Sequence, residues 1–189
     1  MKFDANLAII ACWIIFVIYW IASARRLKPV VEHQSWFRNL AHRLPLGAGV
    51  MLLWVPRLSH RLNLSLTPQT GAARVIGAGL CLLGLFMAVW SRRTLAGNWS
   101  SDVTFKHGHE LIQSGPYRFA RHPIYTGILF MALGTAVAGG LLRCWLGFLL
   151  ILAGLWIKLS LEEALLLRHF PDTYPSYRTR VKALIPFII

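Results

Sequence analysis

Residues 115–123, which read GPYRFARHP, combine the side chains and backbone features that bind anions. A Gly-Pro-Tyr turn comes first, and Arg118, Arg121 and His122 follow it as donors that are cationic or can become so. Pro123 favours the first turn of a helix whose N-terminal amides would point at the same place. A helix N-terminus beside Arg and His is a natural site for an anion.

Two adjacent carboxylates, Glu162 and Glu163, follow an apolar segment about forty residues later. Adjacent residues on a helix point about 100° apart, so we expect one of the two to face a given pocket. A site with an anion-binding half and a carboxylate half suits a zwitterion, such as an amino-acid moiety. Simpler roles stay open: the arginines as topology determinants, His122 as a loop cap and the glutamates as exposed residues.

Other site chemistries fit the residues less well. His107, His109 and His122 come without the thiolates or the regular His/Glu helical spacing of metal sites, so we expect no metal. The three cysteines stand alone in apolar segments without CxxC spacing, which is typical of small core residues. The net charge of +13 gathers at the ends of apolar segments. This favours membrane topology and headgroup contacts over nucleic-acid binding.

The elements that must position these residues are membrane helices. The chain has 189 residues, 56% hydrophobic and 14% charged, with a mean hydropathy of +0.54. This composition is too apolar for a soluble domain of this size. At about 20 residues per span, we predict an all-α integral membrane protein, one membrane domain over residues 1–189, with about five transmembrane helices.

The expected spans follow the apolar segments: 7–24, 44–58, 72–90, 123–142 and 144–161, with a C-terminal region at 162–189. The first lacks a strongly basic leader and a small-residue cleavage site, so we expect a retained helix. The second is marginal, because it is short and Pro45 and Pro56 break it. Gly77, Gly79 and Gly84 in the third favour close helix packing.

Lys and Arg are unevenly distributed between the connections of this five-span order. Fifteen of the 20 fall in segments assigned to one side of the membrane, 25–43, 92–121 and 158–182. The positive-inside rule then predicts an N-terminus outside and a C-terminus in the cytoplasm. The 109–123 stretch and the glutamates would share the cytoplasmic face. Tyr174 and Tyr177 on that side are interpreted as interfacial anchors.

Two motifs carry a resemblance to a known family: HELIQSGPYRFARHPIYTG at 109–127 and EEALLLRHFPDTYPSYRTRVKALIPFI at 162–188. In this order they resemble the isoprenylcysteine carboxyl methyltransferase family and its bacterial relatives, in the wider group that includes phospholipid N-methyltransferases. The similarity runs from about Asn98 to the C-terminus. It implies a membrane methyltransferase that uses S-adenosylmethionine without a Rossmann domain. The cytoplasmic cofactor pocket would be formed by the loop before the fourth span and by the C-terminal region.

The resemblance also assigns cofactor contacts, which fall on His109, Glu110, Leu111, Ile112, Tyr117, His122, Pro123, Ile124, Tyr125 and Glu162. These positions agree with a zwitterion site, and Tyr117 or Tyr125 offers a ring face to adenine. Methyl transfer to a carboxylate or thiolate is an in-line displacement that alignment and exclusion of water accelerate. We therefore assign no general base.

Lys158 stands where the eukaryotic prenylcysteine enzymes have an arginine, four residues before the glutamate. A lysine holds a carboxylate as a point charge and lacks the bidentate fork of arginine. We expect Lys158 and Arg121 to orient a lipophilic acceptor that enters from the lipid between the fourth and fifth spans. The acceptor group would be the carboxylate or thiol of an isoprenylcysteine-like molecule.

Three alternatives stay open. A phospholipid amine N-methyltransferase must deprotonate its amine, so its activity should rise with pH. A membrane reductase related to the sterol reductases would bind NADPH, and a non-catalytic protein that holds lipid headgroups would bind neither cofactor. The resemblance to bacterial relatives suggests the bacterial inner membrane, with membrane lipids and a lipophilic substrate as partners. The oligomeric state is not predicted.

Overall fold

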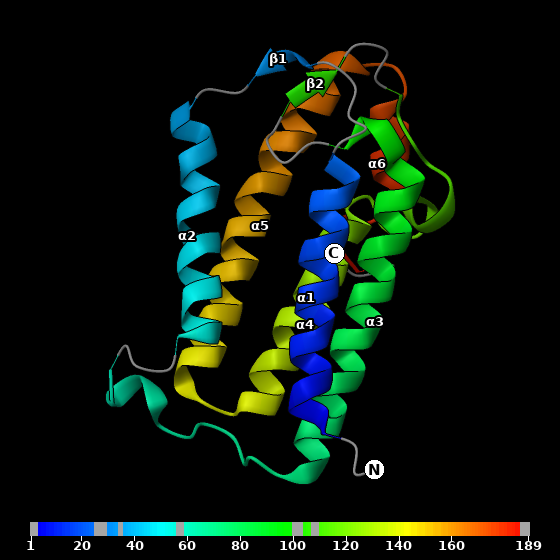
Figure 1. Ribbon diagram of the computed structural model, residues 1–189. Coiled ribbons are helices and arrows are strands. Elements are labelled where there is room, and N and C mark those ends of the chain that lie inside the picture. Colours follow the sequence, from blue (N-terminus) through cyan, green and yellow to red (C-terminus); the bar gives the residue numbers. More distant parts are fainter. Residues whose placement is uncertain are drawn as a thin grey trace.

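Long helices run side by side in the computed structural model, which describes residues 4–24, 30–33, 36–55, 59–99, 104–106 and 110–185 (Figure 1). They are α1 (Ala5–Ser23), α2 (Trp36–Trp54), α3 (Gly71–Leu95), α4 (Pro123–Gly139) and α5 (Leu142–His169), and the short α6 (Tyr174–Arg180) follows. Single 3-10 turns lie at η2 (Arg61–Asn63), η3 (Ala96–Asn98) and η4 (Gly115–Arg118). One short antiparallel pair, β1 (Val30–His33) with β2 (Thr104–Lys106), joins an otherwise helical fold. The predicted all-α membrane class is confirmed.

The two ends of the bundle differ. β1, β2 and α6 lie at one end, called here the strand end, and the turn between α4 and α5 lies at the other, the turn end (Figure 1). Within the described residues, α1, Gly71–Asn98 and α5 are long and apolar enough to cross a membrane, and the apolar α4 is shorter. These helices support membrane insertion.

The second helix differs from its predicted bounds. α2 begins at Trp36, eight residues before the expected position 44, and it ends at Trp54 and not at 58. The prediction that Pro45 breaks this segment was wrong, because Pro45 lies inside the helix. Proline is tolerated within membrane helices when neighbouring groups satisfy the freed carbonyl. Residues 36–43, which precede the predicted span, form the first turns of α2.

α3 and α4 pack backbone against backbone at two crossing points. A Cβ on Gly77 would lie 2.4 Å from the carbonyl oxygen of Gly134, and one on Gly84 would lie 2.4 Å from that of Gly127. Small residues permit this approach, as expected for helices that associate in lipid. Close packing at Gly77 and Gly84 is confirmed. Gly79 takes no part in it, since nothing lies within 4 Å of its Cβ position.

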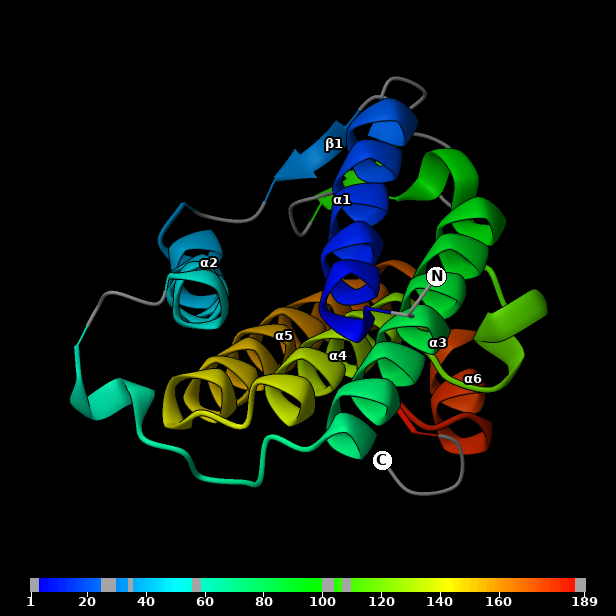
Figure 2. The same cartoon turned by 60° about the horizontal axis from the view of Figure 1, so that its bottom comes forward.

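The helices follow the spatial order α2, α5, α4, α3, with α1 against α3 and α4 (Figure 2). α2 and α5 are antiparallel and also meet at small residues. A Cβ on Gly49 would lie 2.8 Å from the carbonyl oxygen of Gly147, and one on Gly154 would lie 2.7 Å from Leu46 Cγ. At the turn end Arg143 donates to the carbonyls of Leu52 and Leu53, which fixes the last turn of α2.

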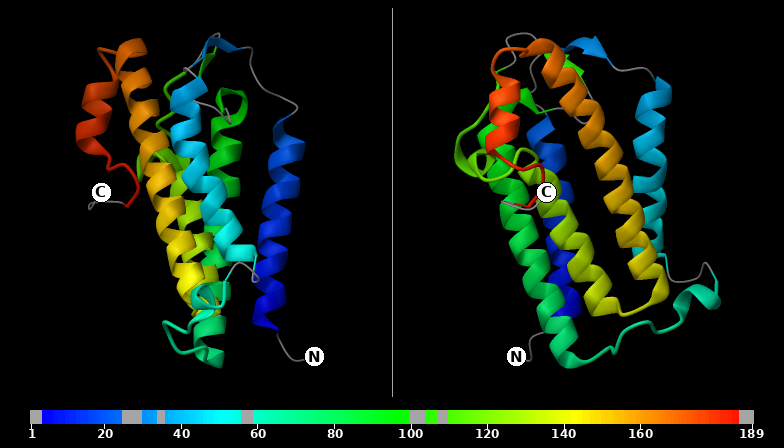
Figure 3. Two further views of the ribbon diagram at one scale, coloured as in Figure 1. Left: turned by 90° about the vertical axis from the view of Figure 1, so that its left-hand side faces the viewer. Right: turned by 180° about the vertical axis from the view of Figure 1, so that it is seen from behind.

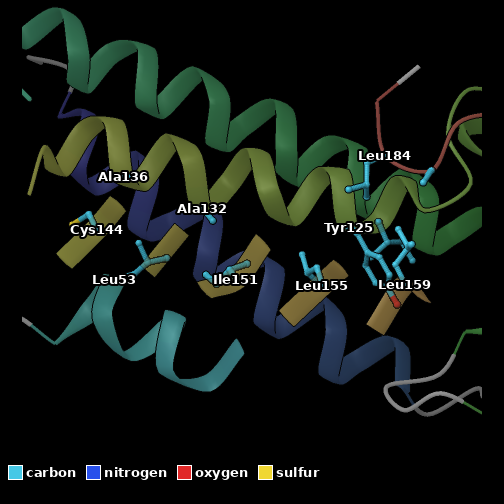
Figure 4. Close-up of a cluster of buried hydrophobic side chains, with 11 residues drawn as sticks. Leu53, Tyr125, Ala132, Ala136, Cys144, Ile151, Leu155, Leu159 and Leu184 are labelled. Atoms are coloured by element: carbon cyan, nitrogen blue, oxygen red, sulfur yellow. The ribbon is translucent and has the colours of Figure 1, made fainter. Parts of the chain in front are cut away.

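A buried hydrophobic cluster runs along α4 and α5 from one end to the other (Figure 4). Cys144, Leu53 and Ala136 lie at its turn end, and Tyr125, Leu159 and Leu184 lie at its strand end. The cluster therefore links the packing of the bundle to Tyr125, the residue at which the polar site begins.

Candidate functional site

The start of α4 brings the predicted anion-binding residues together with the end of α5. His122 precedes Pro123, the first residue of α4, and its ring stacks on Tyr125 with centroids 5.4 Å apart. The Tyr125 hydroxyl donates to Glu162 Oε1 at 2.6 Å, and His122 Nδ1 lies 3.5 Å from Glu162 Oε2. Residues that are about forty positions apart in sequence thus form one polar cluster.

Lys158 lies one helical turn before Glu162 and belongs to the same cluster. Its ammonium is 3.9 Å from Glu162 Oε1 and 5.6 Å from the centroid of the Tyr125 ring. Glu162 lies 20 residues after Leu142, the first residue of α5. At about 1.5 Å per residue this distance matches the hydrocarbon thickness of about 30 Å. The carboxylates therefore lie beyond the membrane-spanning part of α5, at its polar boundary.

Glu163 is the centre of a second, more deeply buried ion-pair network. Its Oε1 accepts hydrogen bonds from Arg121 Nε at 2.8 Å and Nη2 at 2.5 Å, and its Oε2 lies 3.2 Å from Arg178 Nε. His122 Nε2 lies 3.5 Å from Glu163 Oε1. His122 thus stands between the two carboxylates, one on each side of its ring.

Arg121 joins this network to the chain after α5, called here the C-terminal arm (residues 174–185). Its Nη1 donates to the carbonyl oxygens of Arg178 and Val181. The guanidinium of Arg121 thus donates four hydrogen bonds within the protein and has little donor capacity left for a ligand. The geometry therefore favours a positioning role for Arg121 over the predicted contact with the acceptor.

Backbone hydrogen bonds attach the arm to the loop before α4. The amides of Arg121 and His122 donate to the carbonyls of Lys182 and Ala183 at 2.8 and 2.9 Å. Thr126 Oγ1 donates to the carbonyl of Leu184 at 2.7 Å. The arm therefore crosses the strand end of α4, where the view from behind shows it (Figure 3).

Tyr174 and Tyr177 are buried, contrary to the expectation that they are interfacial anchors. They are 1% and 3% exposed, and the Tyr177 hydroxyl donates to the carbonyl of Tyr117 at 2.6 Å. Burial of the two rings fixes α6 against the site loop. These two tyrosines therefore form internal contacts and do not anchor the protein at the membrane surface.

The charges of the cluster stabilise one another. Burial alone would raise the pKa of Glu163, but His122 and Arg121 lower it to about 2. Burial also opposes ionisation of Glu162, yet its pKa is lowered by His122 and Lys158. The two carboxylates in turn raise the pKa of His122, against the effect of burial. The site therefore holds two carboxylates and a histidine that favours its cationic form.

The remaining residues that the resemblance assigns to the cofactor differ in burial and position. Tyr117 is buried, and this burial, together with the nearby Glu162 charge, raises the pKa of its phenol. Ile124 packs into the hydrophobic cluster, and Pro123 is fully buried. Upstream, Glu110 is exposed, whereas Leu111 and Ile112 are half-buried, and His109 lies outside the described residues.

A cavity of about 650 Å³ lies between α4 and α5 and is apolar throughout. Its wall includes Phe130 and Leu133 from α4 and Leu152 and Trp156 from α5. Thr126 and Leu184, at the junction of α4 with the arm, line the same cavity. It thus reaches from the apolar part of the bundle to the residues next to Tyr125.

Comparison with known proteins identifies relatives of the part of the chain that carries this site. The family model described as phospholipid methyltransferase matches residues 72–173, which include the start of α4 and both glutamates. A protein-S-isoprenylcysteine O-methyltransferase of Schizosaccharomyces pombe is 38% identical over 113 residues, 58% of this chain and 48% of that protein. Its counterpart in Saccharomyces cerevisiae is 30% identical over 125 residues, 63% of this chain and 51% of that protein.

A bacterial relative has a different name. Methanethiol S-methyltransferase 1 of Bradyrhizobium diazoefficiens is 40% identical over 73 residues, 38% of this chain and 24% of that protein. The chain spans about half of the length of the two yeast relatives. The resemblance found in the motifs is confirmed by these matches. Because the family model covers more than half of the sequence, the chain belongs to the phospholipid methyltransferase family.

Proposed function

We propose that this protein transfers a methyl group from S-adenosylmethionine to the carboxylate or thiol of a lipophilic, isoprenylcysteine-like acceptor. Transfer takes place at the strand end of the bundle, which faces the cytoplasm of a bacterial cell. The observation that carries the proposal is the cluster of His122, Tyr125 and Glu162 inside the segment that matches the family.

The residues of this cluster fit a zwitterionic cofactor. The Glu162 side chain is 24% exposed, against 8% for Glu163, so its carboxylate is accessible to an ammonium group. His122 Nε2 is buried and faces Glu163 Oε1 at 3.5 Å without a hydrogen bond of good geometry. The ring of Tyr117 or Tyr125 offers a face to adenine. Glu162, His122 and the loop from Glu110 to Tyr117 would hold the cofactor.

Bound S-adenosylmethionine supplies an electrophilic methyl group that needs no further activation. The protein then has to align the acceptor and exclude water, because a carboxylate or thiolate attacks without losing a proton. Lys158, beside Glu162 and Tyr125, can hold an anionic acceptor group next to the cofactor site. The Tyr125 hydroxyl is committed to Glu162 and fixes the orientation of that carboxylate.

The apolar cavity between α4 and α5 supports a lipophilic acceptor. Its volume of about 650 Å³ and its lining of Leu, Phe and Trp suit a hydrocarbon chain. An acceptor dissolved in the bilayer would enter there sideways and place its polar end near the strand end of α4. The thiol remains a candidate beside the carboxylate, because the bacterial relative is named for a thiol.

The decisive experiment is calorimetric titration of the purified protein with S-adenosylhomocysteine, in parallel with NADPH. We expect saturable binding of S-adenosylhomocysteine alone, and weaker binding to Glu162→Gln. Binding of NADPH in its place would assign the protein to the reductases. Binding of neither ligand would leave a protein that holds lipid headgroups.

The pH dependence of turnover separates a phospholipid amine acceptor from a carboxylate acceptor. An amine must be deprotonated before it attacks, so its methylation rises with pH. Methylation of a carboxylate acceptor is expected to be flat above the pKa of that carboxylate.

A further inference from the structure

α2 carries two buried polar side chains that the proposed cofactor site does not use. Asn39 and His42 are 8% and 2% exposed, and a spacing of three residues places them on one face of the helix. Asn39 Oδ1 and His42 Nδ1 make no hydrogen bond of good geometry, although the backbone of Arg38 lies near the His42 imidazole. Buried polar atoms without partners are costly, and polar residues that face the interior of a membrane bundle indicate a function.

The face that carries Asn39 and His42 is the one that packs on α5. Farther along α2, Leu46 lies against Gly154, and so does the carbonyl oxygen of His42. Because the helices are antiparallel, each turn toward the start of α2 corresponds to a turn toward the end of α5. The backbone of His42 thus lies level with Gly154, and Asn39, about one turn earlier on α2, comes level with Lys158, about one turn later on α5.

The charges around His42 agree with this placement. Lys158 and Glu162 are the α5 charges that act on its imidazole, and Arg43 is the neighbouring charge on α2. Lys158 and Glu162 also contact Tyr125 of α4. These two residues of α5 thus separate the cofactor cluster on the α4 side from the unpartnered polar atoms on the α2 side.

We propose that Asn39, His42 and Lys158 form the binding site for the polar head of the methyl acceptor. This assignment rests on the proposed function. The Lys158 ammonium, which also lies 3.9 Å from Glu162 Oε1, attracts an anionic group, and His42 Nδ1 supplies a second polar contact to the same head. The free carbonyl oxygen of Asn39 requires a donor, such as an amide N–H. The head is therefore an acid with an adjacent N–H, as in an N-acylated cysteine.

The position of α2 in the sequence agrees with a role in acceptor choice. The segment matched by the family model begins at residue 72, so it includes Lys158 and Glu162 but not α2. A head-group site built partly on α2 lets acceptor preference change while the cofactor half of the site stays the same.

The test uses the full chain in detergent with two acceptors, N-acetyl-S-farnesylcysteine and S-farnesyl-3-thiopropionate, which lacks the N–H. We expect the wild-type KM to be about tenfold lower for the cysteine probe, the size of one hydrogen bond in a buried site. Asn39→Leu should remove this difference, and Asn39→Asp, which keeps an acceptor oxygen, should retain it. His42→Gln should raise KM for both probes about tenfold.

All variants should bind S-adenosylhomocysteine within about twofold of wild type, which shows that they fold. Leu44→Ala, an exposed position on the same helix, is the control and should leave both KM values unchanged. The assignment is overturned if Asn39→Leu keeps the wild-type preference, or if the wild type shows none. A wild type that binds S-adenosylhomocysteine but methylates neither probe also overturns it, whereas failure to bind that ligand would contradict the proposed function itself.

Discussion

Glu162 and Glu163 are neighbours in sequence but belong to different networks. Glu162 receives the Tyr125 hydroxyl and lies near Lys158, and about a quarter of its side chain is exposed. Glu163 is paired with Arg121 and Arg178 and is almost completely buried. The first carboxylate is therefore available to a ligand, whereas the second holds the C-terminal arm.

Substituting each glutamate by glutamine separates these roles. Glu162→Gln should weaken S-adenosylhomocysteine binding at least about tenfold, because a charge-assisted contact to an ammonium is lost, and it should lower Tm less than Glu163→Gln does, because Glu162 is the more exposed of the two carboxylates. Glu163→Gln should lower stability by about 3 to 5 kcal/mol, because it leaves Arg121 without its buried partner. Calorimetry measures the affinities and thermal unfolding measures the stabilities. Equal and small effects of both changes on binding would contradict the assignment of Glu162.

The same network makes stability depend on pH. The pKa of Glu163 lies near 2 in the folded protein against an ordinary 4.5, so its contribution is complete above about 4.5 and is lost as the pH falls toward 2. The pKa of His122 is raised, so its contribution is complete below the ordinary 6.5 and is lost as the pH rises through the raised value. Tm should be highest between these limits.

A series of thermal unfolding curves from pH 3 to pH 9 checks this dependence. The acid decline should be much smaller in Glu163→Gln, which has no carboxyl group to titrate at that position. An acid decline of the same size in the variant would assign it to other groups.

The site residues show what could be read from the sequence. The resemblance brought His122, Tyr125 and Glu162 into one site, and they do lie together. For Arg121 the sequence suggested a ligand contact, whereas the structure shows an internal ion pair. This pair could not be predicted, because Glu163 and the arm carbonyls that Arg121 binds are 42 to 60 residues away in sequence. Sequence distance hides such pairs, whereas helix periodicity reveals local ones.

Helix boundaries were predictable where apolar segments coincide with spans. The starts of α3 and α4 lie within one residue of their expected positions, 72 and 123. The predicted bounds of α2 were wrong because its first turns are polar and include His42, and because Pro45 was interpreted as a helix break. Hydropathy cannot recognise a helical turn whose buried side chains are polar, as Asn39 and His42 are here.

The glycines of α3 offer a matched test of how the helices associate. Gly84→Leu should cost about 3 kcal/mol or more, because its Cβ would lie 2.4 Å from the carbonyl oxygen of Gly127. Gly79→Leu should be neutral or stabilising, since its Cβ meets nothing and leucine is the better helix former. Thermal unfolding in detergent measures both. Equal losses of stability would contradict the α3–α4 contact.

The polar cluster and the apolar cavity occupy different parts of the bundle. The polar cluster lies at the strand end, whereas the apolar cavity opens along the side of α4 and α5. In the proposed reaction the cofactor arrives from water and the acceptor from lipid. Closure of the cavity should therefore affect only the acceptor.

Ala153→Trp tests this separation, because Ala153 lines the cavity. The larger ring should raise KM for a farnesylated acceptor about tenfold or more by excluding part of its chain, while S-adenosylhomocysteine affinity stays the same. Leu82→Trp on the exposed face of α3 is the control. An unchanged KM in Ala153→Trp would place the acceptor chain elsewhere.

The membrane orientation that the charges predict can be tested in intact bacteria. Fifteen of the 20 Lys and Arg residues fall in segments assigned to one side, which the positive-inside rule places in the cytoplasm.

Ser176 lies in α6 at the strand end, and Ser59 follows α2 at the turn end, and both are exposed. A membrane-impermeant maleimide should label Ser59→Cys in intact cells once the outer membrane is permeable. It should label Ser176→Cys only after the inner membrane is opened. The buried native cysteines should give little background. The reverse pattern would put the carboxylates and Lys158 outside the cell, where S-adenosylmethionine is not supplied, and would contradict the proposed reaction together with the orientation.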